Sequence, residues 1–200
     1  MHRIRPAGIF LAMVLAGCGG GSGGNAEDHD SCGPYPPQST SPYVLPFQVG
    51  QSYLVKRGNC SGVGTHSSGM RLRYAYDFKM PIGTPLVASR DGTVFFVEER
   101  YPDFNHVSGD VNFILIQHED GTLTNYSHLT QDGAHVNVGD AVLRGDIIGS
   151  SGASGDVTDP HLHFHVEACG GCETVAVTFL NTVPQPHGLV EGMTYTAESY

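Results

Sequence analysis

The sequence contains no tryptophan and is poor in positive charge. Only ten lysines and arginines stand against twenty aspartates and glutamates among its 200 residues, so the formal net charge is −10. Proteins that bind nucleic acid place basic patches against the phosphates, and this balance therefore argues against a nucleic-acid partner. It also disfavours direct adsorption to an anionic lipid surface.

Helical periodicity and long apolar runs are also missing from most of the chain. No window of eleven or more residues shows a convincing 3.6-residue period, whereas 27 glycines and twelve prolines favour short strands joined by turns. Beyond the N-terminal segment, no apolar run is long enough to span a bilayer. With 40% hydrophobic residues, the chain is expected to form one soluble, all-β domain.

The first residues carry a targeting signal. An apolar run at residues 8–16 follows two arginines, and Leu-Ala-Gly-Cys at residues 15–18 resembles the lipobox of bacterial lipoproteins. We expect residues 1–17 to be a lipoprotein signal peptide and Cys18 to be lipidated. A plain secretory signal with an incidental cysteine is the alternative. Removal of the signal peptide takes away two arginines and no acidic residue, which leaves a net charge of −12.

A tether and a folded domain are expected after Cys18. Residues 18–42 are rich in glycine and proline and are expected to be flexible, and residues 43–200 are expected to form the domain with an ordered tail. Such a protein belongs to the cell envelope and contacts the membrane through its lipid anchor only. In a Gram-negative cell, Gly19 after the lipidated cysteine favours the periplasmic face of the outer membrane.

Four further cysteines in an exported protein allow up to two disulfides, with three alternative pairings. We favour Cys169 with Cys172 across two glycines, and Cys32 with Cys60 between the tether and the domain. The alternative is half of a zinc knuckle at Cys169 and Cys172. A knuckle needs a second close pair, and Cys32 lies too far from Cys60 in the sequence to supply one.

Two Asp-Gly turns between apolar or β-branched segments are the strongest hairpin signals in the sequence. The first lies within Arg90-Asp91-Gly92 and the second within Glu119-Asp120-Gly121. A third group of short strands and a C-terminal strand with its tail follow. The expected hairpins pair residues 84–89 with 93–98 and residues 111–118 with 122–128.

Eleven histidines exceed the needs of an ordinary domain, and three of them alternate in Asp-Pro-His-Leu-His-Phe-His-Val at residues 159–166. In a strand, His161, His163 and His165 point to one face, while the apolar residues between them point to the other. An apolar back with imidazoles in front predicts a metal site on this strand. The alternative is a set of surface histidines on a half-exposed strand.

Other candidate residues lie earlier in the chain. His66 belongs to a loop that leads to Asp77, a carboxylate flanked by two aromatic residues. A buried carboxylate needs a partner, which a metal ion would supply; a hydrogen-bonded turn residue is the alternative. His128 ends a strand in which the two-residue period places Tyr126 on the same face. By itself, His128 is equally well explained as a strand-end histidine.

The order of these residues along the chain adds information to their types. His66, Asp77 in Tyr-Ala-Tyr-Asp-Phe, His128 in Tyr-Ser-His-Leu, and the histidines of Pro-His-Leu-His-Phe follow one another. This order resembles the LytM/lysostaphin-type zinc metallopeptidases, and the resemblance covers roughly residues 47–168. It implies an antiparallel sheet core of the duplicated-hybrid-motif type.

The resemblance also implies a role for each residue. His66, Asp77 and His163 would ligate one Zn2+ and leave its fourth position to water, as catalytic zinc sites do. His128 and His161 would be catalytic. One would take a proton from that water, and the other would steady the oxyanion or assist the leaving amine.

The chain departs from the commonest family pattern at several positions. Ten residues separate His66 from Asp77 where three are typical, and no other histidine lies near enough upstream to replace His66. His165 stands where Glu or Gln is common, and would be a partner of a ligand or an alternative metal contact. Tyr126 would assist as a hydrogen-bond donor. Four histidines without family counterparts are expected to be solvated: His106, His118, His135 and His187.

The resemblance and the lipoprotein signal together imply an endopeptidase of peptidoglycan cross-links, such as D-Ala–diaminopimelate or Gly–Gly bonds. Its partners would be stem peptides or cross-bridges, and a monomer is expected. One alternative is a catalytically inactive relative that regulates cell-wall amidases, which the five intact site residues disfavour. The other is a periplasmic zinc-binding lipoprotein, which would not need these motifs in this order.

Overall fold

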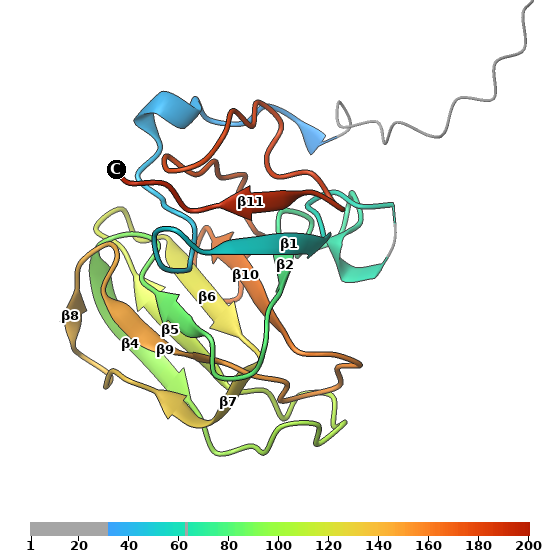
Figure 1. The fold of residues 1–200 in the computed structure, drawn as a ribbon, viewed down its shortest axis with the longest axis vertical. Coiled ribbons are helices and arrows are strands. Elements are labelled where there is room, and N and C mark those ends of the chain that lie inside the picture. Colours follow the sequence, from blue (N-terminus) through green and yellow to red (C-terminus); the bar gives the residue numbers. More distant parts are fainter. Residues whose placement is uncertain (1–31, 63) are drawn as a thin grey trace, which may run out of the picture.

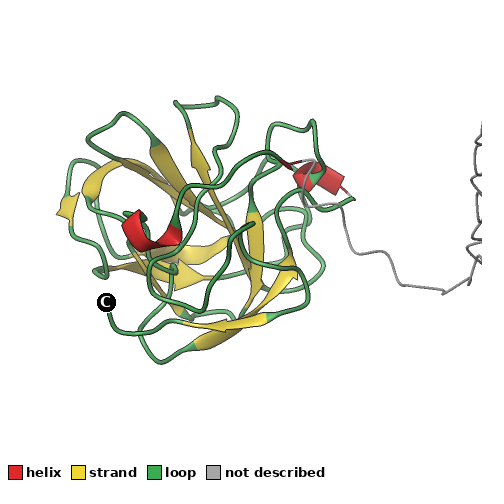
Figure 2. Cartoon of the chain, turned by 90° about the horizontal axis from the view of Figure 1, so that it is seen from above, coloured by secondary structure: helices red, strands yellow, loops and turns green. Residues whose placement is uncertain are grey.

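The computed structural model describes residues 32–62 and 64–200. The expected signal peptide, Cys18 and the first part of the expected tether lie outside these residues. Within them, no helix is long and apolar enough to cross a membrane. Strands and loops make up most of the described chain, with short 3-10 helices such as η2 (Gln38–Thr40) and η3 (Gly64–His66) (Figure 2). The all-β class with antiparallel sheets is confirmed.

Within residues 32–62 and 64–200, eleven strands form two antiparallel sheets. The larger sheet has the order β11-β1-β2-β10-β6-β5-β4-β8, and the smaller has the order β3-β9-β7 (Figure 1). The strands are β1 (Ser52–Arg57), β2 (Tyr76–Lys79), β3 (Pro85–Val87), β4 (Gly92–Glu98), β5 (Phe113–Gln117), β6 (Leu123–Ser127), β7 (Leu129–Ala134), β8 (Ala141–Val142), β9 (Ile147–Ser151), β10 (His161–Glu167) and β11 (Thr194–Thr196).

Strand β10 lies inside the larger sheet, between β2 and β6, and every one of its residues is buried. Leu162, Phe164 and Val166 are fully buried on the core side. The Phe164 ring packs against Phe179 of the C-terminal tail, with 5.7 Å between the ring centroids. The alternation expected from the sequence therefore holds: apolar side chains of β10 anchor the strand and its histidines are left for the other face.

Only one of the two expected hairpins forms. Strands β5 and β6 pair directly, and Gly121 in their connection has a φ of +82°, a value that favours glycine. The expected pairing of residues 84–89 with 93–98 is wrong, because β3 pairs with β9 whereas β4 pairs with β5 and β8. Gly92 is the first residue of β4, where a Cβ would lie 2.5 Å from the Gln117 carbonyl oxygen. This glycine permits close strand packing instead of a turn.

The described part of the N-terminal segment packs against the C-terminal tail, as the blue and red ribbons of Figure 1 show. The Gln38 side-chain amide donates hydrogen bonds to the carbonyls of Phe179 and Thr182, and the Ser41 hydroxyl donates to Thr178. Contacts with the domain thus begin before residue 43, where the sequence placed the start of the domain. The chain has disulfides between Cys32 and Cys60 and between Cys169 and Cys172, the two pairings favoured above.

His118 corrects one expectation about the remaining histidines. His106, His135 and His187 are exposed as expected, but only 3% of the His118 surface is accessible. Its Nδ1 donates to the Asp91 carbonyl at 2.7 Å, and its Nε2 lies 2.5 Å from the Thr124 hydroxyl. His118 therefore cross-links the end of β5 to β6 and to the loop before β4. It is buried, and the expectation of a solvated side chain is wrong.

Candidate metal centre

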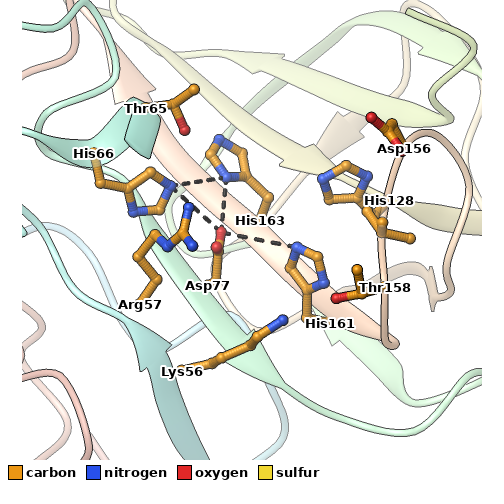
Figure 3. Close-up of a pocket in the computed structure, with 11 residues that line it drawn as sticks. Lys56, Arg57, Thr65, His66, Asp77, His128, Asp156, Thr158, His161 and His163 are labelled. Carbon is orange, nitrogen blue, oxygen red and sulfur yellow. Dashed lines mark hydrogen bonds and ion pairs between the residues drawn. The ribbon is translucent and has the colours of Figure 1, made fainter. Parts of the chain in front are cut away.

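Three side chains from three elements converge in a groove on the face of β10 that points away from the core (Figure 3). His163 lies in β10 and is in register with Asp77 of β2, while His66 ends η3. The Asp77 Oδ1 atom lies 2.9 Å from His163 Nδ1 and 3.5 Å from His66 Nε2. The two imidazole nitrogens are 3.4 Å apart.

Hydrogen bonds on the far sides of the two rings fix which nitrogens face the centre. His66 Nδ1 lies 3.2 Å from the Gly58 carbonyl, which can only accept, so Nε2 is the unprotonated nitrogen. Glu167 accepts from His165 Nε2 at 2.9 Å, and His165 Nδ1 then accepts from His163 Nε2 at 3.0 Å. This chain leaves His163 Nδ1 unprotonated as well.

The centre therefore brings together three electron pairs and no proton. Two imidazole nitrogens and a carboxylate oxygen at 2.9–3.5 Å repel one another unless a cation lies among them. Ligand atoms of a tetrahedral zinc ion at about 2.0–2.1 Å stand about 3.3 Å apart, close to the separations observed here. His66, Asp77 and His163 are also the group of described residues whose ligand atoms lie within 4.8 Å of one another. The donor set fits zinc.

The Asp77 carboxylate is kept ionised at the centre. Burial by itself raises the pKa of this carboxyl group, but the neighbouring imidazoles of His163, His66 and His161 outweigh burial and lower the pKa. For His66, burial lowers the pKa and outweighs the charge of Asp77, which raises it. Burial, aided by the neighbouring charges of His163 and Arg57, lowers its pKa to about 4, so the ring is neutral and free to act as a ligand at neutral pH.

His128 and His161 form a second pair beside the three ligand atoms. Their ring centroids are 4.7 Å apart, and His161 Nε2 lies 3.9 Å from Asp77 Oδ1. His161 Nδ1 donates to the Asp159 carbonyl at 2.9 Å, and His128 Nδ1 donates to the Ser154 carbonyl at 2.8 Å. Each ring is thereby held with its proton on Nδ1 and its Nε2 unprotonated.

Burial keeps this pair of rings neutral, and the backbone of one of them is unusual. His128 has a φ of +66°, which is uncommon for a non-glycine residue and is found where the local structure enforces it. Burial and the neighbouring charges of His161 and His163 lower the pKa of His128 to about 3. Burial also lowers the pKa of His161, although the Asp77 charge opposes the shift. Both imidazoles are therefore neutral bases at pH 7.

His165 and Glu167 continue the hydrogen-bond chain behind His163. His165 contacts the remote nitrogen of His163, which matches the first of the two roles considered above, a partner of a ligand. Glu167 Oε1 accepts from Arg71 Nη1 at 3.1 Å, and Oε2 accepts from the Gly171 backbone at 2.7 Å. Burial raises the pKa of Glu167, but these bonds together lower it, so the chain ends in a carboxylate.

Tyr126 does not reach the centre. Its side chain is fully buried among core aromatics, 5.5 Å from the Phe164 ring centroid, and its hydroxyl accepts a hydrogen bond from the Ser89 backbone. A regular strand would place Tyr126 and His128 on the same face, but the positive φ of His128 ends the regular alternation there. The expected hydrogen-bonding role of Tyr126 in the site is therefore wrong.

The groove contains three charged residues and one threonine that the sequence reasoning missed. Lys56, Arg57, Asp156 and Thr158 line it together with the histidines (Figure 3). No local pattern in the sequence places the first two in the groove, because their direction depends on the pairing of β1 with β2. Glu167 was also missed, although it lies two residues after His165 and so shares its face of the strand.

Residues 71–175 match the sequence model of Peptidase family M23, which is more than half of the chain. The chain belongs to Peptidase family M23. The resemblance to LytM/lysostaphin-type peptidases is confirmed. Asp77, His128, His161 and His163 lie inside the matched segment, whereas His66 precedes it and joins the centre through the fold.

Among curated relatives of this M23 chain, the Peptidoglycan DD-endopeptidase ShyA of Vibrio cholerae is 42% identical over 90 residues, 45% of this chain and 19% of the relative. The Cell division protein DipM of Caulobacter vibrioides is 32% identical over 113 residues, 56% of this chain and 16% of the relative. The chain thus spans about a fifth or less of the length of these relatives.

Solved structures show the same fold. The catalytic domain of the prophage-encoded M23 protein EnpA from Enterococcus faecalis superposes with a TM-score of 0.50 at 21% identity, over 66% of this chain and 93% of that domain. At this identity the likeness concerns the fold alone.

Proposed function

We propose that this M23 chain is a zinc-dependent endopeptidase that hydrolyses peptide cross-links of peptidoglycan. The observation that carries the proposal is the convergence of three unprotonated ligand atoms and two neutral, oriented imidazoles in one groove. A relative named Peptidoglycan DD-endopeptidase supports the substrate class. His66, Asp77 and His163 would hold the zinc ion, which when bound supplies a Lewis acid and lowers the pKa of water to about 7.

The chain's own residues would position the peptide and move the protons. The unprotonated Nε2 of His161 or His128 accepts a proton from the attacking water, and the same ring, now protonated at Nε2, gives this proton to the leaving amine. The backbone carbonyls of Asp159 and Ser154 keep both rings in this orientation throughout. His161 is buried and His128 is partly buried, which limits the access of competing water to the reacting atoms.

Zinc content and release of muropeptides from purified sacculi test this proposal together. The wild type is expected to hold one zinc ion per chain and to release muropeptides. His161→Ala is expected to keep the zinc and to lose at least about 100-fold in rate, because general acid–base groups contribute that much. Asp77→Asn is expected to lose zinc. The exposed His106→Ala serves as the matched control and retains both properties.

A zinc-loaded wild type that releases nothing from any sacculus would overturn the enzyme reading. It would favour the alternative of a regulator of amidases, which needs the fold and no hydrolysis.

We further propose that the domain works in the cell envelope as a monomer tethered through lipidated Cys18, on the periplasmic face of the outer membrane in a Gram-negative cell. The lipobox-like segment at residues 15–18 and the glycine-rich stretch after it support this location. Metabolic labelling with palmitate is expected to mark the wild type and not Cys18→Ser. Recovery of an unlabelled wild type in the soluble fraction would contradict the anchor.

A further inference from the structure

Two adjacent cations face the groove because strand β1 is irregular at its end. In the pairing of β1 with β2, Val55 is in register with Phe78 and Arg57 with Asp77, so Lys56 is an extra residue. Val55 is fully buried in the core, and in a regular strand Lys56 and Arg57 would then point to opposite faces. The bulge re-aims the strand, and both side chains line the groove (Figure 3).

Only one of the two cations is free to meet a ligand. Lys56 forms an ion pair with Asp159, which precedes β10, and is thereby committed to the structure of the groove wall. Arg57 is half-buried, and among residues 32–62 and 64–200 it forms no ion pair with a carboxylate.

The turn that carries His66 is shaped around this guanidinium. A Cβ at Gly64 would lie 2.7 Å from Arg57 Nη1, and Gly64 has a φ of +68°. Glycine therefore leaves the room that the guanidinium occupies beside η3. An unpaired guanidinium in a partly buried groove loses hydration without a compensating partner, and the partner that its planar fork matches best is a carboxylate.

We propose that Arg57 binds a free carboxylate of the substrate next to the scissile amide. This inference rests on the proposed peptidase function and names its substrate class. In a D-Ala–diaminopimelate cross-link, the carbon attached to the scissile nitrogen also bears a free carboxylate. An amide inside a glycine bridge has none. Arg57 therefore selects cross-links made directly between stem peptides over glycine bridges.

The net charge of the molecule makes this local cation decisive. A chain with a formal charge of −10 repels an anionic stem peptide at long range, so recognition has to come from a short-range, directional contact. Arg57 supplies that contact at the wall of the groove that also carries His66.

Binding and hydrolysis of a matched pair of substrates test the proposal. The probes are a cross-linked diaminopimelate muropeptide dimer and the same dimer with that carboxylate converted to a carboxamide. Affinity is measured by calorimetry with zinc-loaded His161→Ala protein, which is expected not to consume the substrate, with and without Arg57→Gln. Arg100→Gln, which removes an exposed arginine paired with Glu98, controls for the change in net charge.

Arg57→Gln is expected to weaken binding of the free-carboxylate dimer by about 10- to 150-fold, the range for a lost hydrogen bond to a charged group, and binding of the amidated dimer by less than about threefold. Arg57→Lys is expected to fall between, since it keeps the charge and loses the fork. Arg100→Gln should bind both dimers as the parent does.

Equal losses on both dimers, equal affinities of the parent for the two dimers, or binding of neither dimer would overturn the carboxylate site. Failure of the peptidase function looks different. In that case the zinc-loaded chain with an intact His161 hydrolyses neither dimer nor a pentaglycine bridge, whatever their affinities.

Discussion

To ligate a metal ion, the imidazole of His163 would have to present an unprotonated Nδ1, and its neighbours decide whether it does. Glu167 accepts from His165, His165 accepts from His163, and each bond fixes the tautomer of the next ring. Because Glu167 is buried and held by Arg71 and the Gly171 backbone, its carboxylate is the fixed end of this chain. Mutation of groups that orient metal-ligating histidines in this way typically lowers metal affinity by about 10- to 100-fold.

Glu167→Gln is therefore expected to weaken zinc binding. A glutamine can present its amide nitrogen to His165 Nε2, which favours the opposite tautomer along the chain and turns a proton on His163 toward the centre. The zinc dissociation constant, measured by competition with a chelator, should rise about 10- to 100-fold.

Glu173→Gln is the matched control for this substitution. Glu173 is an exposed carboxylate paired with Arg73, so its change removes the same charge without touching His165. A Glu167→Gln protein that binds zinc as tightly as the Glu173→Gln protein would show that the chain does not orient His163.

For individual residues, the sequence predicted the placement of the β10 histidines better than the placement of the residues around them. Alternation in β10 correctly placed His161, His163 and His165 on one face, because the apolar residues between them leave no other register. Tyr126 was misplaced because one residue with positive φ ends the period. Arg57 could not be predicted in the groove, because its direction depends on a bulge that forms only when β1 pairs with β2.

For strands and turns as well, the local sequence predicts some features, and others depend on pairing with distant strands. Gly121 is a turn glycine with positive φ, and the hairpin predicted around it forms. The same Asp-Gly pair at Asp91 and Gly92 does not make a hairpin, because β4 finds its partners elsewhere and Gly92 is needed for contact with Gln117. Local turn chemistry is identical in both cases, and only the long-range pairing of the strands distinguishes them.

The β5–β6 hairpin contains a buried histidine, which makes its stability depend on pH. Burial lowers the pKa of His118 from its ordinary value of 6.5, although the hydrogen bond to the Asp91 carbonyl opposes this. Below pH 6.5 the unfolded chain therefore binds a proton that the folded chain excludes. By linkage, His118 stabilises the fold fully above pH 6.5, and this contribution is lost as the pH falls toward the lower pKa of the folded state.

His118→Asn is expected to reduce the loss of stability in acid, because asparagine does not titrate and its amide can still donate to Asp91. Urea unfolding of the zinc-loaded proteins between pH 7.5 and 5.5 measures the effect. The wild-type free energy of unfolding should fall more steeply below pH 6.5, by up to about 1.4 kcal/mol per pH unit relative to the variant. Exposed His135→Asn should keep the wild-type slope, and a similar slope for His118→Asn would refute the assignment.

At the scale of the whole molecule, the N-terminal segment and the tail close the domain around the site. Cys32 is buried and joined to Cys60, which belongs to the same loop as Gly58 and His66. The M23 match begins at residue 71, so this loop and its disulfide lie outside the matched segment, and they hold His66 beside Asp77 and His163. The cysteine pairings were predictable because few combinations exist, but their connection to His66 required the folded chain.

Loss of the Cys32–Cys60 disulfide is therefore expected to affect both the fold and the centre. The bond spans 28 residues, and loop-closure entropy assigns it about 3–4 kcal/mol of stability, whereas the bond across three residues between Cys169 and Cys172 constrains the unfolded chain less. Replacing Cys32 and Cys60 together by serine should lower the unfolding free energy by about twice as much as the same change at Cys169 and Cys172. Because the freed loop carries His66 and its Gly58 partner, zinc affinity should also fall in the first double variant. Equal losses of stability in the two variants, with zinc affinity unchanged in both, would show that His66 is held by η3 and the groove without help from the disulfide.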